Sequence, residues 1–372
     1  MIDFRNLSRR RFLELSGATG VALGVSGAGL MRPALAATPL APVAEEDAVI
    51  AFGYVGPTSD EGWTWQHDQG RLAVQEAFPK AKTIFVENIP YSADAGRTFR
   101  QFVSEGANMI ITNSTYGDFI YDVAKNAPET AFLHCDDRTL MDNMGVFYPS
   151  HWYPSYVTGV AAGHMSESSK LGYVASFPVP SSFAGSNAFL LGARSVKPDA
   201  TIQVIAINSW FDPQASTQAA RALIDNGADV LFGIMDEPGY LQVAEQRGKK
   251  AVMLNTDSRK YGPNAYVSSI MFDFRKFYVD QVRARLEGKW VPGQFLLPFG
   301  DGTDRDAWGE TVPAGAAKAA DEVREKILGG WNPFQGEIKD NKGEVRVPAG
   351  QSMSDNDIYN WNWSVDGSSG LA

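Results

Sequence analysis

From Val49 onward the sequence alternates strand-like and helix-like segments, and this alternation restricts the chain to a small set of folds. Short apolar runs rich in β-branched and aromatic residues predict strands, and the segments between them predict helices. The first series comprises strands at 49–55, 82–88, 109–113 and 131–135 and helices at 70–78, 95–105 and 118–126. Alternating units of this kind predict a parallel sheet with helices on both faces.

A second series follows an aromatic stretch interrupted by prolines, Phe147 to Pro154. Its predicted strands lie at 171–177, 201–208, 230–234 and 251–255, and its predicted helices at 156–165, 183–195, 214–226 and 239–247. The fold class is therefore α/β, with two Rossmann-like lobes, a hinge and a ligand cleft between the lobes. A single long Rossmann enzyme is the alternative, but no Gly-x-Gly-x-x-Gly follows the first strand.

The last hundred or so residues suggest that the chain returns between the lobes. A helix at 274–286 precedes a Pro/Gly-rich segment at 290–306, and a helix at 314–328 precedes a region of turns. We expect lobe 1 to comprise 48–148 and 268–290, lobe 2 to comprise 149–267 and 291–345, and a C-terminal tail to follow at 346–372. Several crossings would form a hinge about which the lobes close on a ligand.

Residues 1–36 have the features of an export signal. Ser8-Arg9-Arg10-Arg11-Phe12-Leu13 is similar to a twin-arginine motif, and Ala34-Leu35-Ala36 fits a cleavage site. The apolar run between them is interrupted by five glycines, which makes a membrane anchor the weaker interpretation. We expect a cleaved signal peptide, a flexible leader at 37–47 and a soluble periplasmic protein.

The charge and motif content narrows the class of function. With 43 acidic and 33 basic residues the net charge is −10, which argues against nucleic acid or an anionic membrane as a partner. The single cysteine, Cys135, allows no internal disulfide. The four histidines lack metal-site spacing, and neither a phosphate loop nor a nucleophile elbow is present. We therefore expect no metal, no cofactor and no catalysis, with a periplasmic nucleoside hydrolase as the alternative from another class.

The loops after the predicted strands carry the candidate ligand-binding residues, because ligands of open α/β sheets bind beyond the carboxyl ends of the strands. The residue types are aromatic, carboxylate and amide, with almost no Lys or Arg. The first series contributes Asp60, Trp63, Ser114, Tyr116 and Asp136, and the second contributes Phe177, Asn187, Trp210, Phe211, Asp236 and Asp257. Aromatic side chains from the two lobes could bracket a flat ring whose edge binds carboxylates and amides. This pattern predicts a neutral planar ligand such as a purine, with a sugar as the next candidate.

Structural alternatives exist for several of these residues. Asp136 adjoins Asp137, and only one of the two carboxylates can point inward. Asp257 stands in a Thr-Asp-Ser sequence that is equally typical of a turn, and Tyr116 could belong to the core. Either tryptophan of the first loop could pack under the sheet edge.

Six segments of the chain, taken together, form a fairly specific match to one known family. They are 53–70, 105–111, 156–163, 171–175, 226–232 and 336–350. They resemble the basic membrane protein family, the solute-binding proteins of ABC importers that include purine-nucleoside receptors. The resemblance implies the type I periplasmic binding protein fold and an ABC permease of the inner membrane as partner. It also implies that Trp63 and either Trp210 or Phe211 stack on the base, that Asp136 binds the base edge, and that Asp257 lies near a ribose.

The sequence departs from the family at one position. Nucleoside-binding members tend to carry a lysine near the ribose hydroxyls, where this chain has the apolar side chains of Met271 and Phe272. A sugar hydroxyl left unpaired there would cost about 1–3 kcal/mol. We therefore predict a monomeric receptor for a free nucleobase, adenine or a close analogue, with Asn187 adding a polar contact. A purine nucleoside remains the alternative ligand of the same fold.

Overall fold

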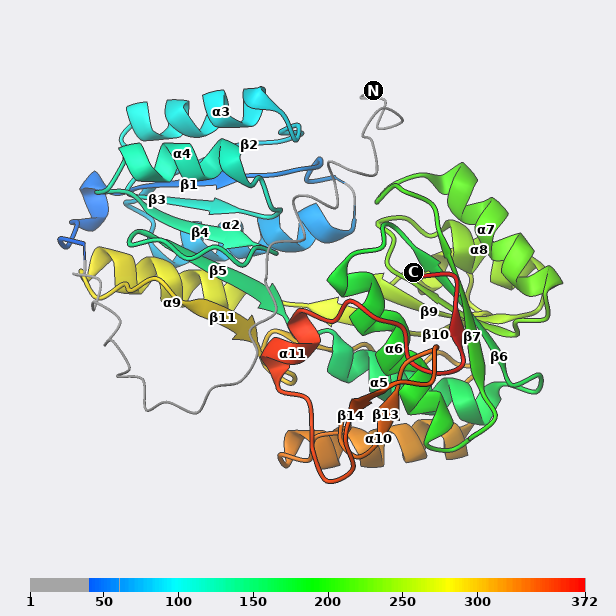
Figure 1. Ribbon diagram of the computed structural model, residues 1–372. Coiled ribbons are helices and arrows are strands. Elements are labelled where there is room, and N and C mark those ends of the chain that lie inside the picture. The colour runs from blue at the N-terminus through cyan, green and yellow to red at the C-terminus, as the bar shows by residue number, and fades with distance from the viewer. Residues whose placement is uncertain (1–39, 60, 372) are drawn as a thin grey trace. The chain divides into compact units, whose positions relative to one another are not determined.

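The computed structural model describes residues 40–59 and 61–371, so the predicted export signal and Asp60 lie outside the described residues. The first sheet has the strand order β11-β5-β4-β3-β1-β2, and its strands run parallel (Figure 1). These strands are β1 (Val49–Gly53), β2 (Lys82–Val86), β3 (Met109–Thr112), β4 (Ala131–Cys135), β5 (Met144–Pro149) and β11 (Gln294–Leu297). We call this sheet and its helices lobe 1.

Both faces of the lobe 1 sheet are covered by helices. Alternate residues of β1 belong to two separate apolar clusters, with Phe52 in one and Ala51 in the other. The first cluster includes residues of α2 (Trp63–Ala77) and α9 (Arg275–Leu286), and the second includes residues of α3 (Ala93–Ser104) and α4 (Asp118–Asn126). Burial on both faces explains why these strands are continuous apolar runs in the sequence.

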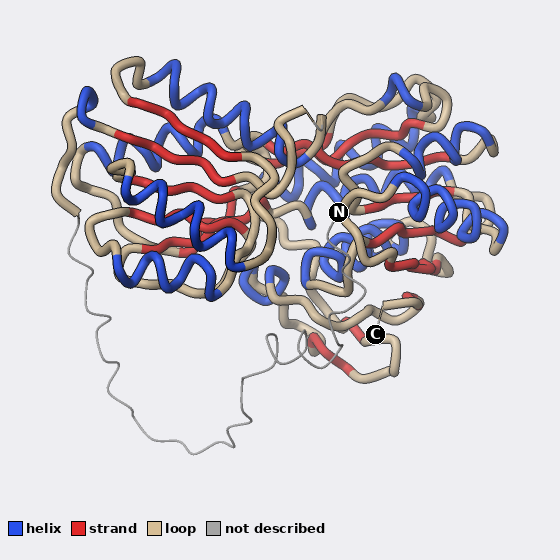
Figure 2. The backbone as a smooth tube through the Cα atoms, turned by 90° about the horizontal axis from the view of Figure 1, so that it is seen from above, coloured by secondary structure: helices blue, strands red, loops and turns tan. Residues whose placement is uncertain are grey.

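The second sheet has the order β12-β10-β9-β8-β6-β7-β15, and we call it and its helices lobe 2. Its strands are β6 (Lys170–Ala175), β7 (Thr201–Ala206), β8 (Val230–Gly233), β9 (Lys250–Asn255), β10 (Tyr266–Phe272), β12 (Thr303–Arg305) and β15 (Ser368–Ser369). Its helices are α5 (Trp152–Met165), α6 (Pro180–Arg194), α7 (Pro213–Asp225), α8 (Gly239–Gln246) and α10 (Ala314–Leu328). The first five strands of each series pair in the same relative order, which confirms the predicted duplication of one α/β architecture. Figure 2 shows the strands of both sheets with helices beside them.

The chain crosses between the sheets later than the sequence suggests. β10 continues in the lobe 2 sheet to Phe272, beyond the boundary expected at residue 268, because it pairs with β9 along its length. β11 then belongs to the lobe 1 sheet as far as Leu297, where the expectation places lobe 2 from residue 291. The segment expected as a tail joins lobe 2, since β15 pairs with β7 and Trp361 is buried.

Helix α2 begins at Trp63, seven residues before the predicted start at Gly70. Gly70 lies inside the helix because the ring of Tyr278 on α9 approaches to 2.5 Å of the position that a Cβ would occupy. The glycine therefore permits a close contact between two helices rather than marking a helix end. This earlier start places Trp63 on the first turn of α2.

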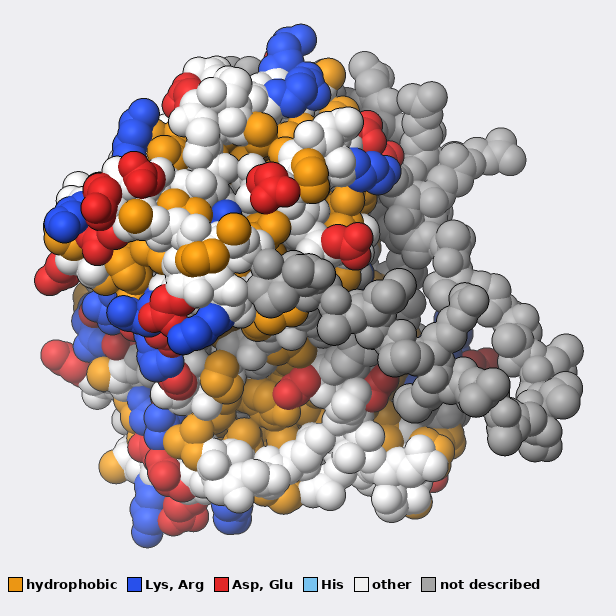
Figure 3. Space-filling model, turned by 90° about the vertical axis from the view of Figure 1, so that its left-hand side faces the viewer, with side chains coloured by type: hydrophobic (Ala, Val, Ile, Leu, Met, Phe, Trp, Pro, Cys, Tyr) orange, Lys and Arg blue, Asp and Glu red, His pale blue; other side chains and the backbone are white. Residues whose placement is uncertain are grey.

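No helix in the described part of the chain is long and apolar enough to cross a membrane. Acidic and basic side chains are interspersed on the face shown in Figure 3. That mixture agrees with the modest net charge of −10 for a chain of this length.

Helices α5 and α6 pack backbone to backbone at glycine positions. A Cβ at Gly192 would collide with the carbonyl oxygen of Tyr156, and a Cβ at Gly159 would collide with that of Phe189. Gly315, in the first turn of α10, has no neighbouring atom in the way.

We predict that Gly192→Ala lowers the free energy of unfolding by about 1–3 kcal/mol, because the helices must separate. The matched substitution Gly315→Ala should raise it by roughly 0.5–1 kcal/mol through improved helix propensity. Thermal and urea unfolding of the mature protein measure both effects. Equal stability of the two variants would contradict the close packing described here.

Candidate ligand-binding site

The first turn of α2 and the loop before it contact the carboxyl ends of strands in both sheets. The side-chain amide of Gln66 donates a hydrogen bond to the carbonyl oxygen of Asn255 at 2.6 Å. The hydroxyl of Thr256 donates to the carbonyl oxygen of Glu61 at 2.7 Å. Gly62 lies against the same strand ends, since a Cβ there would be 3.5 Å from the side-chain nitrogen of Asn255. The strand ends of lobe 1 and lobe 2 therefore border one region.

Trp63 is fixed at this border by a hydrogen bond and by aromatic packing. Its indole nitrogen donates to the carbonyl oxygen of Asn113 at 2.7 Å, which ties the ring to the end of β3. Its ring centre lies 5.5 Å from those of Phe272 and Phe274 and 6.2 Å from that of Tyr148. The side chain remains partly exposed. The structure thus brings together Trp63 and Phe272, two of the predicted site residues, from different lobes.

His67, one turn along α2, supports Trp63 from within lobe 1. Its imidazole stacks on Phe274 at 3.8 Å and meets the indole of Trp63 edge-on at 4.4 Å. Its Nδ1 shares a hydrogen bond of 2.5 Å with the hydroxyl of Tyr278. Burial lowers the pKa of His67 well below its usual value, so the imidazole is neutral and packs like an aromatic ring of the core. Sequence reasoning did not single out His67, because a lone histidine on a helix carries no motif.

The adjacent carboxylates Asp136 and Asp137 have different surroundings. Asp137 is buried and accepts hydrogen bonds from the hydroxyls of Thr115 and Tyr121 and from the backbone amide of Thr139. Burial raises the pKa of Asp137, but the nearby His134 and these hydrogen bonds outweigh that effect and leave it below the ordinary value. Asp137 is therefore a satisfied internal group that shapes the loop after β4.

Asp136 adopts a positive φ of 53°, and its carboxylate has a different partner. Its carboxylate pairs with Arg138 at 3.0 Å and is about one quarter exposed. It lines a small cavity, too narrow to hold a water molecule, together with Tyr148 and Ser181. Burial raises the pKa of Asp136, and the Arg138 guanidinium opposes that rise. Because Tyr148 contacts both this cavity and the ring of Trp63, Asp136 lies close to the aromatic cluster.

The predicted residues of lobe 2 form a second group at the ends of its strands. The side-chain amide of Asn255 donates to the carboxylate of Asp236 at 2.9 Å. The backbone amide of Asp236 donates to the carbonyl oxygen of Trp210 at 3.0 Å, and the ring of Trp210 lies 5.7 Å from that of Phe177. Trp210 is 38% exposed and the neighbouring Phe211 is 60% exposed. Asp236, Trp210 and Phe177 are therefore contiguous.

Four predicted residues lie with other partners. Tyr116 is fully buried in lobe 1, where its ring meets Phe99 edge-on at 5.0 Å. The amide of Asn187 donates to the carbonyl oxygen of Trp363 and accepts from the backbone of Val365, so it anchors the C-terminal region instead of facing a ligand. These packing contacts correct the expectations for Tyr116 and Asn187.

The other two keep local contacts. Asp257 pairs with the side chain of Arg259 at 2.8 Å and accepts a hydrogen bond from the backbone amide of the same residue at 3.0 Å. Ser114 is partly buried, and its carbonyl oxygen accepts a hydrogen bond from the hydroxyl of Thr112 at 3.2 Å. Neither contact excludes a position at the edge of the strand ends.

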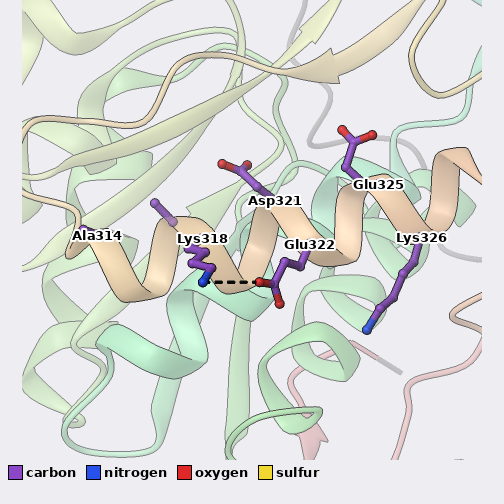
Figure 4. Close-up of a pocket in the computed structure, with 7 residues that line it drawn as sticks. Ala314, Lys318, Asp321, Glu322, Glu325 and Lys326 are labelled. Carbon is purple, nitrogen blue, oxygen red and sulfur yellow. Dashed lines mark ion pairs between the residues drawn. The ribbon is translucent and has the colours of Figure 1, made fainter.

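The exposed face of α10 carries a wider depression that has none of these features. Figure 4 shows its charged side chains along one helix, with Lys318 and Glu322 paired at 3.8 Å. It is an open surface of mixed charge, whereas a ligand pocket is concave and mainly apolar. In addition, no group of three or more metal-ligating side chains occurs within 40–59 and 61–371. The strand ends therefore remain the candidate site.

Two similar parallel α/β lobes whose strand ends face each other define a type I periplasmic binding protein. A solute-binding protein of an ABC transporter system from Aeropyrum pernix has this fold, with a TM-score of 0.65 and 16% identity over 84% of this chain and 95% of that chain. Residues 48–297 match the Bmp family, described as ABC transporter substrate-binding proteins that are PnrA-like. The chain belongs to this family, as its sequence suggests.

Two relatives extend the comparison over most of the chain. A purine-binding protein of Brucella abortus is 36% identical over 327 residues, which cover 87% of this chain and 93% of the relative. A protein of Haloferax volcanii named as a candidate glucose-binding protein of an ABC transporter is 34% identical over 76% of this chain and 73% of its own length. Both names describe binding proteins and not enzymes.

We predict that Asp137→Ala lowers the free energy of unfolding by about 2–4 kcal/mol at pH 7, because the donors on Thr115, Tyr121 and Thr139 lose the buried carboxylate that they share. Asp142→Ala, at an exposed position a few residues away, should change it by less than about 0.5 kcal/mol. A carboxyl with a lowered pKa stabilises the fold above its ordinary value of 3.8 and loses that contribution as the pH falls further. Urea unfolding between neutral and acidic pH measures the difference, which should shrink toward the acidic end.

Proposed function

We propose that this substrate-binding protein takes up a purine nucleobase, adenine or a close analogue, between its lobes. The observation that carries the proposal is the indole of Trp63, which is held by Asn113 at the border of the two sheets and is partly exposed there. An aromatic ring fixed at such a position offers a stacking surface worth on the order of 1–3 kcal/mol for a planar base. The purine-binding relative from Brucella abortus supports the same ligand class.

The polar groups near Trp63 suit the edge of a heteroaromatic ring. Asp136 offers an acceptor for an N–H donor of the base. The side-chain oxygen of Asn255 is buried and has no hydrogen-bond partner among the described residues, so it offers a second acceptor. A buried acceptor of this kind costs stability unless a ligand or water satisfies it. Two acceptors with a stacking ring favour a flat ligand that is rich in N–H donors.

The apolar packing around Trp63 favours a base over a nucleoside. Phe272 is only 4% exposed and fills the space beside the indole. The segment from Ser268 to Phe274 contains no lysine, and the next cation, Arg275, pairs with Asp273. A ribose placed there would meet an aromatic side chain in place of hydrogen-bonding groups.

Trp210 and Phe211 are the candidates for the second stacking surface, from the lobe 2 side of the site. Trp210 is connected to Asp236 through its backbone and packs on Phe177, whereas Phe211 extends further into solvent. Trp210 is therefore the better supported of the two.

A sugar is the alternative ligand, and the glucose-binding name of the Haloferax volcanii relative favours it. Indoles also stack on apolar sugar faces, and carboxylates bind hydroxyls. A purine nucleoside bound by the same site is the other alternative. Incubation with nucleosides and detection of released base distinguishes a binding protein from a nucleoside hydrolase.

We further propose that the protein works as an exported monomer. In this proposal, the twin-arginine segment directs export, cleavage after Ala36 releases the mature chain into the periplasm, and the loaded protein delivers its ligand to an ABC permease. The family supports an extracytoplasmic receptor with a membrane permease as partner.

Calorimetric titration of the mature protein with adenine tests the stacking role of Trp63. We expect saturable binding by the wild type, and about tenfold or more weaker binding by Trp63→Ala, because one stacking face is lost. Trp331→Ala is the matched control, since this tryptophan is 38% exposed and packs on Tyr156 in lobe 2. Equal affinity of Trp63→Ala and Trp331→Ala would contradict the proposed site, and heat with glucose alone would favour the sugar alternative.

A further inference from the structure

Arg138 connects the carboxylate of Asp136 to the C-terminal region of the chain. One guanidinium nitrogen, Nη1, pairs with the Asp136 carboxylate at 3.0 Å. The other, Nη2, donates to the carbonyl oxygen of Tyr359 at 2.8 Å, and Nε donates to the side-chain oxygen of Asn360 at 3.3 Å. The guanidinium also lies 3.9 Å from the centre of the Tyr359 ring. The position of this cation is thus set by residues more than 200 positions away in sequence.

The C-terminal segment that holds Arg138, residues 354–360, is itself anchored. It begins with a capping box between Ser354 and Asp357 at the start of α11 (Asp355–Tyr359). The carboxylate of Asp355 accepts a hydrogen bond from the hydroxyl of Tyr153 on α5 at 2.7 Å. The hydroxyl of Tyr359 donates to the carbonyl oxygen of Asp137 at 2.8 Å. The segment therefore bridges lobe 2 and the loop after β4.

The surroundings of Asp136 disfavour its charged form, and its pKa lies above the ordinary value even beside Arg138. Desolvation and the neighbouring charge of Asp137 both raise the pKa of Asp136, and Arg138 lowers it. The other titratable groups that face this carboxyl are Cys135 on β4, Tyr148 on β5, Tyr359 on α11 and, across the small cavity, His151. Burial keeps these four groups neutral near pH 7. Arg138 is therefore the group that compensates the carboxylate charge.

We propose that Arg138 is a positioning residue that holds the Asp136 carboxylate as a fixed, charged acceptor at the end of β4, and that residues 354–360 hold Arg138. The consequence of this arrangement for ligand affinity rests on the proposed function, in which Asp136 accepts a hydrogen bond from the edge of the base. A protonated carboxyl would accept that hydrogen bond more weakly, because a bond to an ionised carboxylate is roughly twice as strong as one to a neutral acceptor, and a rotatable carboxyl would hold it less firmly.

The simpler alternative is that the ion pair of Asp136 and Arg138 only stabilises its loop and has no role in binding. The chain contains another ion pair that fits this description. Asp273 and Arg275 have the same spacing in sequence and pair at 2.6 Å, but the side chain of Arg275 is 64% exposed. Arg138 is 36% exposed and contacts a remote segment through two of its three guanidinium nitrogens, Nε and Nη2. This remote anchoring is what indicates a positioning role.

The test combines two measurements on the mature protein. The first is the ¹³C carboxyl resonance of Asp136 as a function of pH without ligand, assigned with Asp136→Asn. The second is the affinity for adenine between mildly acidic and mildly basic pH. Both are made on the wild type, Arg138→Met, Arg138→Lys and Asn360→Ala. Arg346→Met is the control, because Arg346 is also an ion-paired and ring-stacked arginine, with an exposure of 37%, on the C-terminal region.

We expect Arg138→Met to raise the titration midpoint of Asp136 and to weaken adenine binding by about tenfold or more at pH 7, with the loss extending to higher pH than in the wild type. Arg138→Lys should recover part of both effects, Asn360→Ala should shift both slightly in the same direction, and Arg346→Met should change neither. An unchanged carboxyl titration in Arg138→Met overturns the inference, whether or not adenine binds. A shifted titration with unchanged adenine affinity also overturns it. Failure of the wild type to bind adenine, with the shifted titration retained, contradicts the proposed function and supports the hold of Arg138 on Asp136.

Discussion

The burial of both faces of two mainly parallel sheets is the constraint on which the rest of the structure depends. Helices α2, α9, α3 and α4 cover the first sheet, and the corresponding helices of lobe 2 cover the second. The strand ends are then the main place for polar chemistry, because the strand interiors consist mostly of apolar side chains. This explains why Asp136 and Asp236, which follow strands, and Asn255, the last residue of β9, are polar groups that face other elements across the border.

The aromatic and acidic groups at this border depend on one another. The hydrogen bond from Trp63 to Asn113 fixes the indole, and the neutral imidazole of His67 supports it from within lobe 1. The carboxylates are not isolated either. Asp136, Asp257 and Asp273 each pair with an arginine two residues later, so the strand ends are less negative than their carboxylates alone suggest. Such a site suits a neutral ligand better than a cation or a polyanion.

Much of the fold could be predicted from the sequence, since continuous apolar runs indicate strands that are buried on both faces. The alternation of segments gave β1, β3 and β4 within a few residues of their observed bounds. It did not give β5, whose Tyr148-Pro149 end resembles a loop, or the crossing after β10. Periodicity also cannot show that Gly70 serves a helix contact, because that requirement comes from Tyr278 on a distant segment.

The site could be predicted only in part, for a related reason. Trp63 is identifiable as an aromatic residue after the first strand, and Phe272 through its place where the family tends to carry a lysine. Their contact depends on packing between segments more than 200 residues apart. The sequence analysis found almost no Lys or Arg in the loops after the strands and did not identify Arg138. An arginine two residues after an aspartate carries no motif of its own. Asn187 had the chemistry of a ligand contact, yet its amide is used by Trp363 and Val365 of the C-terminal region. Residue type predicts what a side chain can bind, whereas tertiary packing decides which partner it has.

The most direct measurement is a thermal-shift screen of the mature protein against nucleobases, nucleosides and sugars, each at a large excess. A ligand at about 100 times its dissociation constant should add about 2.7 kcal/mol of stability to the folded state. The account predicts a clear rise in melting temperature with adenine or hypoxanthine and little or none with their nucleosides. A rise with nucleosides alone would contradict the apolar packing argument at Phe272, and a response only to sugars would contradict the purine assignment itself.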